Sequence, residues 1–322
     1  MGWLTRQLGC SGPPARRILH RLAGLLPAVS PAGEAGVGLP DSELDALCKE
    51  FQLADLTPGL GLSGGLVECG WWGSALGDIA LSTGARPGGR SVLREAALFH
   101  LGFQLFDIVV DNVPAHTRAL AGALRPDFLR ARLVRPLDDA SALHSDDHTA
   151  SLIVRLFDAA ISSAGQRLHA DSPHADYIAE LLQRMYTSEL RTSPDPFDAK
   201  RLPVVFVGAL AIHPSNGRAS ELFVHLSQFL SLWDDWADLA EDMLRGAPNA
   251  FLSSMHESRP RRALAYAGRS VLRVTSGRAG HGGIVARLRE PLDASLALAR
   301  QLGPDSHDKV VSICRHLMRE QP

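Results

Sequence analysis

Apolar residues recur at helical spacing through most of this chain, and this pattern constrains its fold more than any other feature. Within residues 91–113, Leu93, Ala97, Leu101 and Leu105 follow one another at intervals of four. Such spacing places apolar side chains along one face of a helix. Period-two alternation bounded by hairpin turns is nowhere convincing, so strands are not expected. The sequence therefore predicts an all-α fold.

Several further segments share this helical periodicity. Helices are expected over residues 41–53, 146–169, 175–187, 199–212, 219–244, 261–274, 283–302 and 309–319, with a short one near 16–26, and Gly-rich turns set apart a segment at 66–83. Residues 1–40 are rich in Gly, Pro, Ala and Arg, and are predicted to form a flexible N-terminal extension. Residues 41–322 are predicted to form a single helical domain.

Composition excludes several classes of protein. The chain has 322 residues, of which 45% are hydrophobic, so it can bury a large core and is not wholly disordered. A formal net charge of −2 without a dense basic stripe argues against a nucleic-acid partner. No apolar run approaches the roughly 18 residues of a membrane span, and no signal peptide is evident, so a cytoplasmic protein that is not integral to a membrane is expected. The 4 cysteines include no CxxC pair, so neither a zinc site nor a disulfide framework is indicated.

Two clusters of aspartates lie toward the ends of long apolar helices. Asp107 and Asp111 form the first cluster, and Asp234, Asp238 and Asp242 belong to the second. Spacing by four stacks these carboxylates on one helical face, where like charges repel one another. A hard divalent cation such as Mg²⁺ would offset that repulsion.

Aromatic and apolar residues precede both clusters, and this context bears on their interpretation. A run of charges on a helix is ordinarily a solvated face, but here Phe99, Phe103 and Phe106 precede the first cluster, and Leu232 and Trp233 precede the second. An apolar setting is unusual for a solvated acidic face. The pattern therefore favours two facing helices whose carboxylates bind metal.

The second cluster also carries a resemblance to a known superfamily. The segment Asp234-Asp235-Trp236-Ala237-Asp238 resembles the DDxxD motif of the all-α class I isoprenoid synthases, which include polyprenyl diphosphate synthases, squalene and phytoene synthases and terpene cyclases. The tail at residues 246–249 is similar to that of atypical prenyltransferases of this superfamily. Lys200, which precedes an apolar helix, is similar to the lysine that leads the helix before this motif in polyprenyl synthases. The resemblance runs from about residue 91 to residue 249.

The resemblance implies a single-domain helical bundle that acts on a prenyl diphosphate of 10, 15 or 20 carbons with Mg²⁺, three ions being bound together with the diphosphate. It leaves room for a homodimer. The implied catalytic residues and metal ligands are Asp107, Asp111, Asp234 and Asp238, with Asp235 and Asp242 as further metal-site residues. The implied diphosphate-binding residues are Arg191, Lys200, Arg245 and Asn249. Residues expected to line the prenyl pocket are Phe99, Phe103, Ser227, Leu230 and Trp233.

Departures from the superfamily pattern narrow the expected reaction. Ile108 replaces the second aspartate of the first motif, and Arg118 stands alone where chain elongases place paired arginines. These missing residues normally hold isopentenyl diphosphate. The first expectation is therefore a terpene synthase that cyclises an acyclic prenyl diphosphate. A prenyltransferase with a non-isopentenyl acceptor and a polyprenyl diphosphate synthase remain alternatives.

Another segment offers a different class of function. His144, Asp146, Asp147 and His148 are residue types that bind transition metals, as in HD-type phosphohydrolases. An aspartate at this position is also a natural N-cap for the helix expected from residue 146, and the capping interpretation is favoured. A metal-free helical scaffold is a further alternative.

Overall fold

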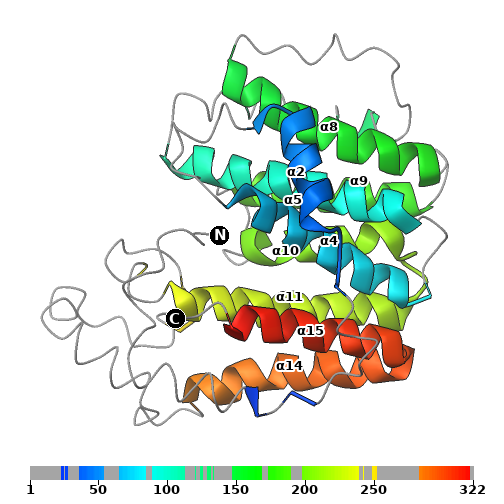
Figure 1. Cartoon of the computed structure of the whole chain (residues 1–322), viewed down its shortest axis with the longest axis vertical. Coiled ribbons are helices and arrows are strands. Elements are labelled where there is room, and N and C mark those ends of the chain that lie inside the picture. The colour runs from blue at the N-terminus through cyan, green and yellow to red at the C-terminus, as the bar shows by residue number, and fades with distance from the viewer. Residues whose placement is uncertain are drawn as a thin grey trace, which may run out of the picture.

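The described part of the chain consists of α-helices and contains no strand, which confirms the predicted all-α class (Figure 1). The computed structural model describes residues 23–24, 26–27, 36–53, 65–84, 89–112, 120, 124–125, 129–131, 133, 147–168, 173–189, 198–238, 242, 249–251 and 283–319. Its helices are α2 (Asp41–Glu50), α4 (Leu66–Ser82), α5 (Gly89–Asn112), α8 (His148–Leu168), α9 (Pro173–Glu189), α10 (Asp198–Ala211), α11 (Gly217–Ala237), α14 (Gly283–Leu302) and α15 (Pro304–Arg319).

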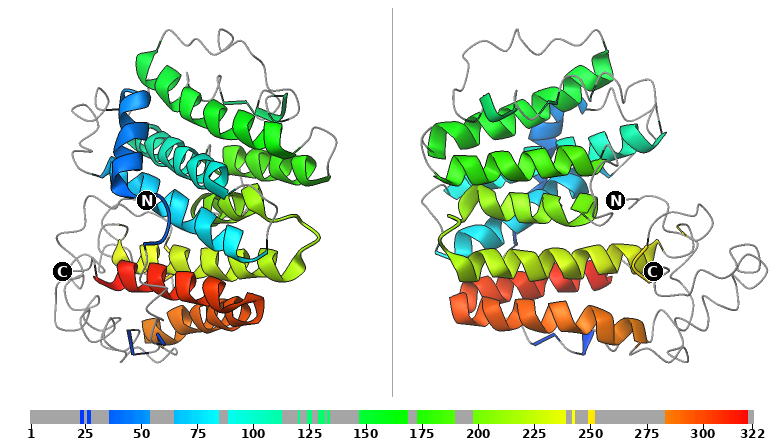
Figure 2. Two further views of the ribbon diagram at one scale, coloured as in Figure 1. Left: turned by 45° about the vertical axis from the view of Figure 1, so that its right-hand side comes forward. Right: turned by 180° about the vertical axis from the view of Figure 1, so that it is seen from behind.

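Helix α10 occupies the middle of the bundle. It packs against α9, α4 and α5 on one side and against α11 on the other (Figure 1). Helices α8 and α9 lie at one end in Figures 1 and 2, and α14 lies at the other, beside α11 and α15. None of the described helices combines the length and the apolar character needed to cross a membrane.

Helices α4 and α5 approach unusually closely because glycines line their contact. A Cβ atom on Gly73 would lie 2.2 Å from the carbonyl oxygen of Ala96, and one on Gly77 would lie 3.0 Å from the Ala96 methyl group. Nearby, His100 Nδ1 is 2.8 Å from the carbonyl oxygen of Cys69 and donates a hydrogen bond to it. Small residues and this bond therefore fix α5 against α4.

A buried ion pair joins α5, α8 and α10. Arg167 on α8 donates to Glu95 Oε2 on α5 at 2.6 Å and to the carbonyl oxygen of Leu210 on α10 at 2.7 Å. The hydroxyl of Ser163 donates to the other oxygen of Glu95, whose side chain is only 1% exposed. Because both oxygens of this carboxylate are bonded, its burial is compensated.

Several helix ends differ from those expected. Helix α11 spans Gly217–Ala237, whereas the expected helix ran to residue 244, and the side-chain amide of Asn249 donates to the Asp235 carbonyl in its last turn. Helix α15 begins at Pro304, five positions before the expected start at 309, which agrees with the preference of proline for the first helical turn. The helix expected over 261–274 lies outside the described residues.

The structure also bears on the capping aspartate and on where the packed domain begins. Asp147 Oδ1 accepts a hydrogen bond from the Ala150 amide at 3.0 Å, which confirms the capping interpretation of that aspartate. Within the segment predicted as an extension, Val37 and Leu39 are buried in the core, and the Leu39 amide donates to Ser74 Oγ. The packed domain therefore includes residues before position 41.

Candidate functional site

Three helix ends that carry the predicted site lie on the same side of the bundle. The C-terminal end of α5, the start of α10 and the C-terminal end of α11 share one side both in Figure 1 and in the view from behind in Figure 2. The amphipathic pattern of each helix turns its apolar face into the core. The aspartates near the ends of α5 and α11 and the lysine near the start of α10 are thus presented by one end of the fold.

Lys200 lies at the centre of the best-defined charge cluster. Its ammonium contacts Asp234 Oδ2 at 3.0 Å and also donates a hydrogen bond to Asp235 Oδ1. Burial alone would lower the pKa of Lys200, but the two carboxylates raise it by more, so its pKa lies well above the usual range and it stays charged. The Asp235 side chain is 0% exposed, and that of Lys200 retains 26% exposure. One cation is therefore shared between a buried and a nearly buried carboxylate.

A turn at residues 249–251 completes the surroundings of Asp235. The Ala250 amide donates to Asp235 Oδ2 at 2.9 Å, so both carboxylate oxygens of Asp235 are engaged. The side-chain amide of Asn249 donates to the Asp235 carbonyl oxygen at 2.6 Å and to Asp242 Oδ2 at 2.7 Å. Burial raises the pKa of Asp242, and the bond from Asn249 opposes that shift. Asn249 thus fastens the turn to the second aspartate cluster.

The remaining acidic residues of the prediction are less enclosed. Asp107 and Asp238 are half-buried, and Asp238 is the C-cap residue of α11, its amide donating to the Asp234 carbonyl oxygen at 2.9 Å. Asp111 lies in the last turn of α5, and its side chain is outside the described residues, as are Arg191 and Arg245. The structure therefore brings together Lys200, Asp234, Asp235, Asp242 and Asn249.

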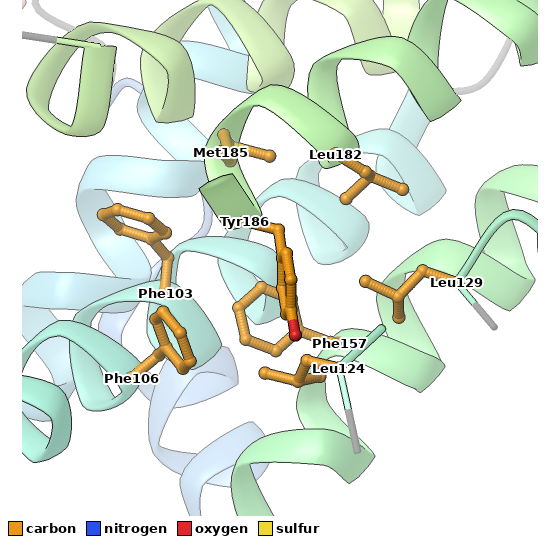
Figure 3. Close-up of a pocket in the computed structure, with 8 residues that line it drawn as sticks. All are labelled: Phe103, Phe106, Leu124, Leu129, Phe157, Leu182, Met185 and Tyr186. Carbon is orange, nitrogen blue, oxygen red and sulfur yellow. The ribbon is translucent and has the colours of Figure 1, made fainter. Parts of the chain in front are cut away.

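An apolar cavity opens beside α5, beginning one turn before Asp107 (Figure 3). Its cavity volume is about 30 Å³, and Tyr186 supplies a phenolic hydroxyl in an otherwise apolar lining. Helix α5 contributes Phe103 and Phe106, and α8 contributes Phe157. The other lining residues are Leu124, Leu129, Leu182, Met185 and Tyr186.

Of the predicted pocket residues, Phe103 lines this cavity. Phe99 instead stacks on Phe206 of α10, with ring centres 4.0 Å apart, and meets Phe157 edge to face. The Ser227 hydroxyl donates to the carbonyl of Val224 on its own helix. Leu230 packs against the core, and Trp233 contacts the rings of Phe229 and Trp236.

Sequence reasoning missed the wall that α9 provides. Leu182, Met185 and Tyr186 follow helical spacing, but the same spacing occurs on any helix face that packs in a core. Arg287 on α14 was also missed. It donates to the Ala250 carbonyl oxygen at 2.9 Å, although no local motif surrounds it in the sequence.

The donor chemistry fits a hard divalent cation, although the described side chains do not enclose a complete site. Among them, no group of three or more His, Cys, Asp or Glu residues gathers closely enough to hold a metal ion. The Lys200 ammonium lies 3.0 Å from Asp234 Oδ2, so this carboxylate is already paired with one positive charge. The carboxylates there are all-oxygen donors of the kind that Mg²⁺ prefers.

Comparisons with known proteins do not add to the description of this site. A scan against protein-family models and searches of curated proteins and of solved structures gave no match to the chain.

Proposed function

We propose that this protein is a Mg²⁺-dependent class I terpene synthase, with the helical bundle of the isoprenoid synthases, that ionises an acyclic prenyl diphosphate. The observation that carries the proposal is the sharing of the Lys200 ammonium between Asp234 and Asp235 at the end of α11. Both aspartates lie within the segment that resembles the DDxxD motif. A lysine held by carboxylates is a donor suited to a diphosphate oxygen.

The aspartates divide between two roles in this proposal. Asp107, Asp111, Asp234 and Asp238 hold Mg²⁺, which supplies Lewis-acid stabilisation of the departing diphosphate when bound. Asp235 holds Lys200 in place, because its own oxygens are both engaged and its side chain is fully buried. Lys200 donates to the diphosphate, and each such charge-assisted bond contributes about 1.5 to 3 kcal/mol.

In this proposal the apolar cavity beside α5, which has a volume of about 30 Å³, widens to receive the prenyl chain. Its lining of aromatic and aliphatic side chains excludes water from a carbocation, and aromatic faces such as that of Phe103 stabilise a cation by about 0.5 to 2 kcal/mol each. Burial of the chain contributes about 0.8 kcal/mol per methylene. The mostly apolar lining therefore favours a hydrocarbon over a polar ligand.

Cyclisation is favoured over chain elongation because of the sequence after Asp111. Elongation holds a second diphosphate beside the first, and two such anions repel unless dedicated cations lie between them. The segment supplies Arg118 alone in place of paired arginines. An allylic cation formed here is then captured by its own double bonds, by water or by an acceptor without a diphosphate.

The test is to incubate the protein with Mg²⁺ and prenyl diphosphates of 10, 15 and 20 carbons. Released diphosphate is quantified, and a hexane extract is analysed by mass spectrometry. A cyclic hydrocarbon or alcohol that disappears with EDTA, or with the Asp234→Asn variant, supports the proposal. No diphosphate release from any substrate would contradict it, and turnover of a generic phosphodiester in its place would favour a phosphohydrolase.

A further inference from the structure

Arg287 is a half-buried arginine on α14, and its described contacts both lie on the turn at residues 249–251. Its Nη1 donates to the Ala250 carbonyl oxygen at 2.9 Å, and its guanidinium carbon lies 4.8 Å from the centre of the Phe251 ring. A hydrogen bond from a charged donor is stronger than a neutral one, and stacking on an aromatic face orients the planar guanidinium. Arg287 therefore binds the turn from the α14 side.

Asp235 of α11 binds the same turn from the other side. The Ala250 amide donates to Asp235 Oδ2 at 2.9 Å, while its carbonyl accepts from Arg287, so this one residue is held between two helices. The Phe251 amide donates to Asn249 Oδ1 at 2.9 Å, which closes the turn on itself. A shift of the turn would thus move a hydrogen-bond donor of Asp235.

Asp235 in turn fixes the lysine. One of its oxygens accepts from Ala250 and the other from Lys200, and it has no exposed surface through which water could replace either partner. A carboxylate with fixed partners on both oxygens holds its cation in one direction. The described bonds therefore run without interruption from Arg287 through Ala250 and Asp235 to Lys200.

We infer that Arg287 is a positioning residue for the diphosphate site. It holds the 249–251 turn so that Asp235 aims the Lys200 ammonium at the position of the diphosphate beside Asp234. This role rests on the proposed function, which assigns the diphosphate to Lys200. It adds α14, which lies outside the segment that resembles the isoprenoid synthases, to the residues that shape the site.

Two variants and a matched control test this role. Arg287→Met keeps an unbranched stem over Phe251 but removes the donor, and Arg287→Lys keeps a charged donor. Arg289→Met is the control, because Arg289 is an exposed residue of the same helix paired with Asp293. Affinity for inorganic pyrophosphate in the presence of Mg²⁺ is measured by calorimetry. Arg287→Met is expected to weaken it about tenfold, which corresponds to about 1.4 kcal/mol of binding free energy. Arg287→Lys should recover most of the affinity, and Arg289→Met should leave it unchanged.

A second readout does not depend on the proposed function. The chain has only three lysines, so the acylation rates of Lys49, Lys200 and Lys309 can be followed separately by mass spectrometry. Arg287→Met should accelerate labelling of Lys200 severalfold and leave that of Lys309, which pairs with Asp78 and Asp305, unchanged.

The outcomes separate the two hypotheses. If the parent protein shows no Mg²⁺-dependent pyrophosphate binding, the proposed function fails, while a selective rise in Lys200 labelling still supports the bonded path from Arg287. Unchanged labelling of Lys200 in Arg287→Met, or an equal rise at all three lysines, overturns the positioning role whatever the protein binds.

Discussion

Replacing Lys200 with methionine would leave two carboxylates without their shared cation. Asp235 is fully buried and Asp234 is 7% exposed, so neither charge can be solvated well by water in the folded state. Removing one partner of a buried ion pair typically costs about 3 to 5 kcal/mol. Because the Lys200 side chain keeps 26% exposure, we expect a loss near the lower end, about 3 kcal/mol of unfolding free energy.

The pH dependence of this loss follows from the direction of the Lys200 shift. The pKa of Lys200 is raised in the folded state, because its two carboxylates outweigh the effect of burial. Its contribution to stability is therefore fully present below the unfolded value of about 10.4 and is lost only as the pH rises through the higher folded value. The difference between the parent and Lys200→Met should stay constant from about pH 6 to pH 9.

Urea denaturation followed by circular dichroism measures the difference, and a double variant serves as the control. In Lys200→Met/Asp235→Asn the carboxamide oxygen still accepts from the Ala250 amide, but no unpaired charge is buried at that position. The part of the loss that comes from Asp235 should return, while the part from Asp234 remains. A loss below about 1 kcal/mol in the single variant, as exposed ion pairs give, would refute the argument that this pair is buried and mutually dependent.

Four further predictions concern activity and stability. Asp234→Asn and Asp238→Asn, made separately, should each abolish diphosphate release while leaving helical circular dichroism near that of the parent; full activity in both would remove the carboxylates from the site. Phe103→Ala enlarges the cavity and should change the chain length accepted or the product mixture, as seen by mass spectrometry, whereas unchanged products with lower stability would make Phe103 a packing residue only. Radiolabelled isopentenyl diphosphate, supplied with an allylic primer and Mg²⁺, should not enter a longer diphosphate, and efficient incorporation would indicate a polyprenyl synthase. Burial lowers the pKa of His100 to about 4, so stability should fall by roughly 3 kcal/mol as the pH drops from about 6.5 to 4, and His100→Gln should show less of this fall in denaturation curves.

Helical periodicity was sufficient to predict where most helices of the described chain lie, since each buries one apolar stripe. It did not predict that the Asn249 side chain binds the Asp235 carbonyl at the end of α11, from 14 positions further along the chain. A propensity read along one helix carries no information about such a partner.

Part of the candidate site, likewise, could be predicted from the sequence and part could not. The DDxxD-like pattern and Lys200 led to residues that the structure brings into contact. The sequence could not show that Asp235 is engaged at both oxygens, because the Ala250 amide is a backbone group that every residue type except proline offers. Nor could it show Arg287, one of 30 arginines in the chain, whose partner is a backbone carbonyl on a distant turn.

The glycine contact between α4 and α5 determines how this protein can be re-engineered. Helix α5 already packs so closely on Gly73 that a Cβ atom there would strike the Ala96 carbonyl, so α5 cannot move closer to α4 without rebuilding α4 as well. The stacking of Phe99 on Phe206 resists a shift of α5 relative to α10 in the same way. Libraries aimed at larger substrates should therefore keep the backbone of α5 and vary the side chains that α9 projects into the cavity, at positions Leu182, Met185 and Tyr186.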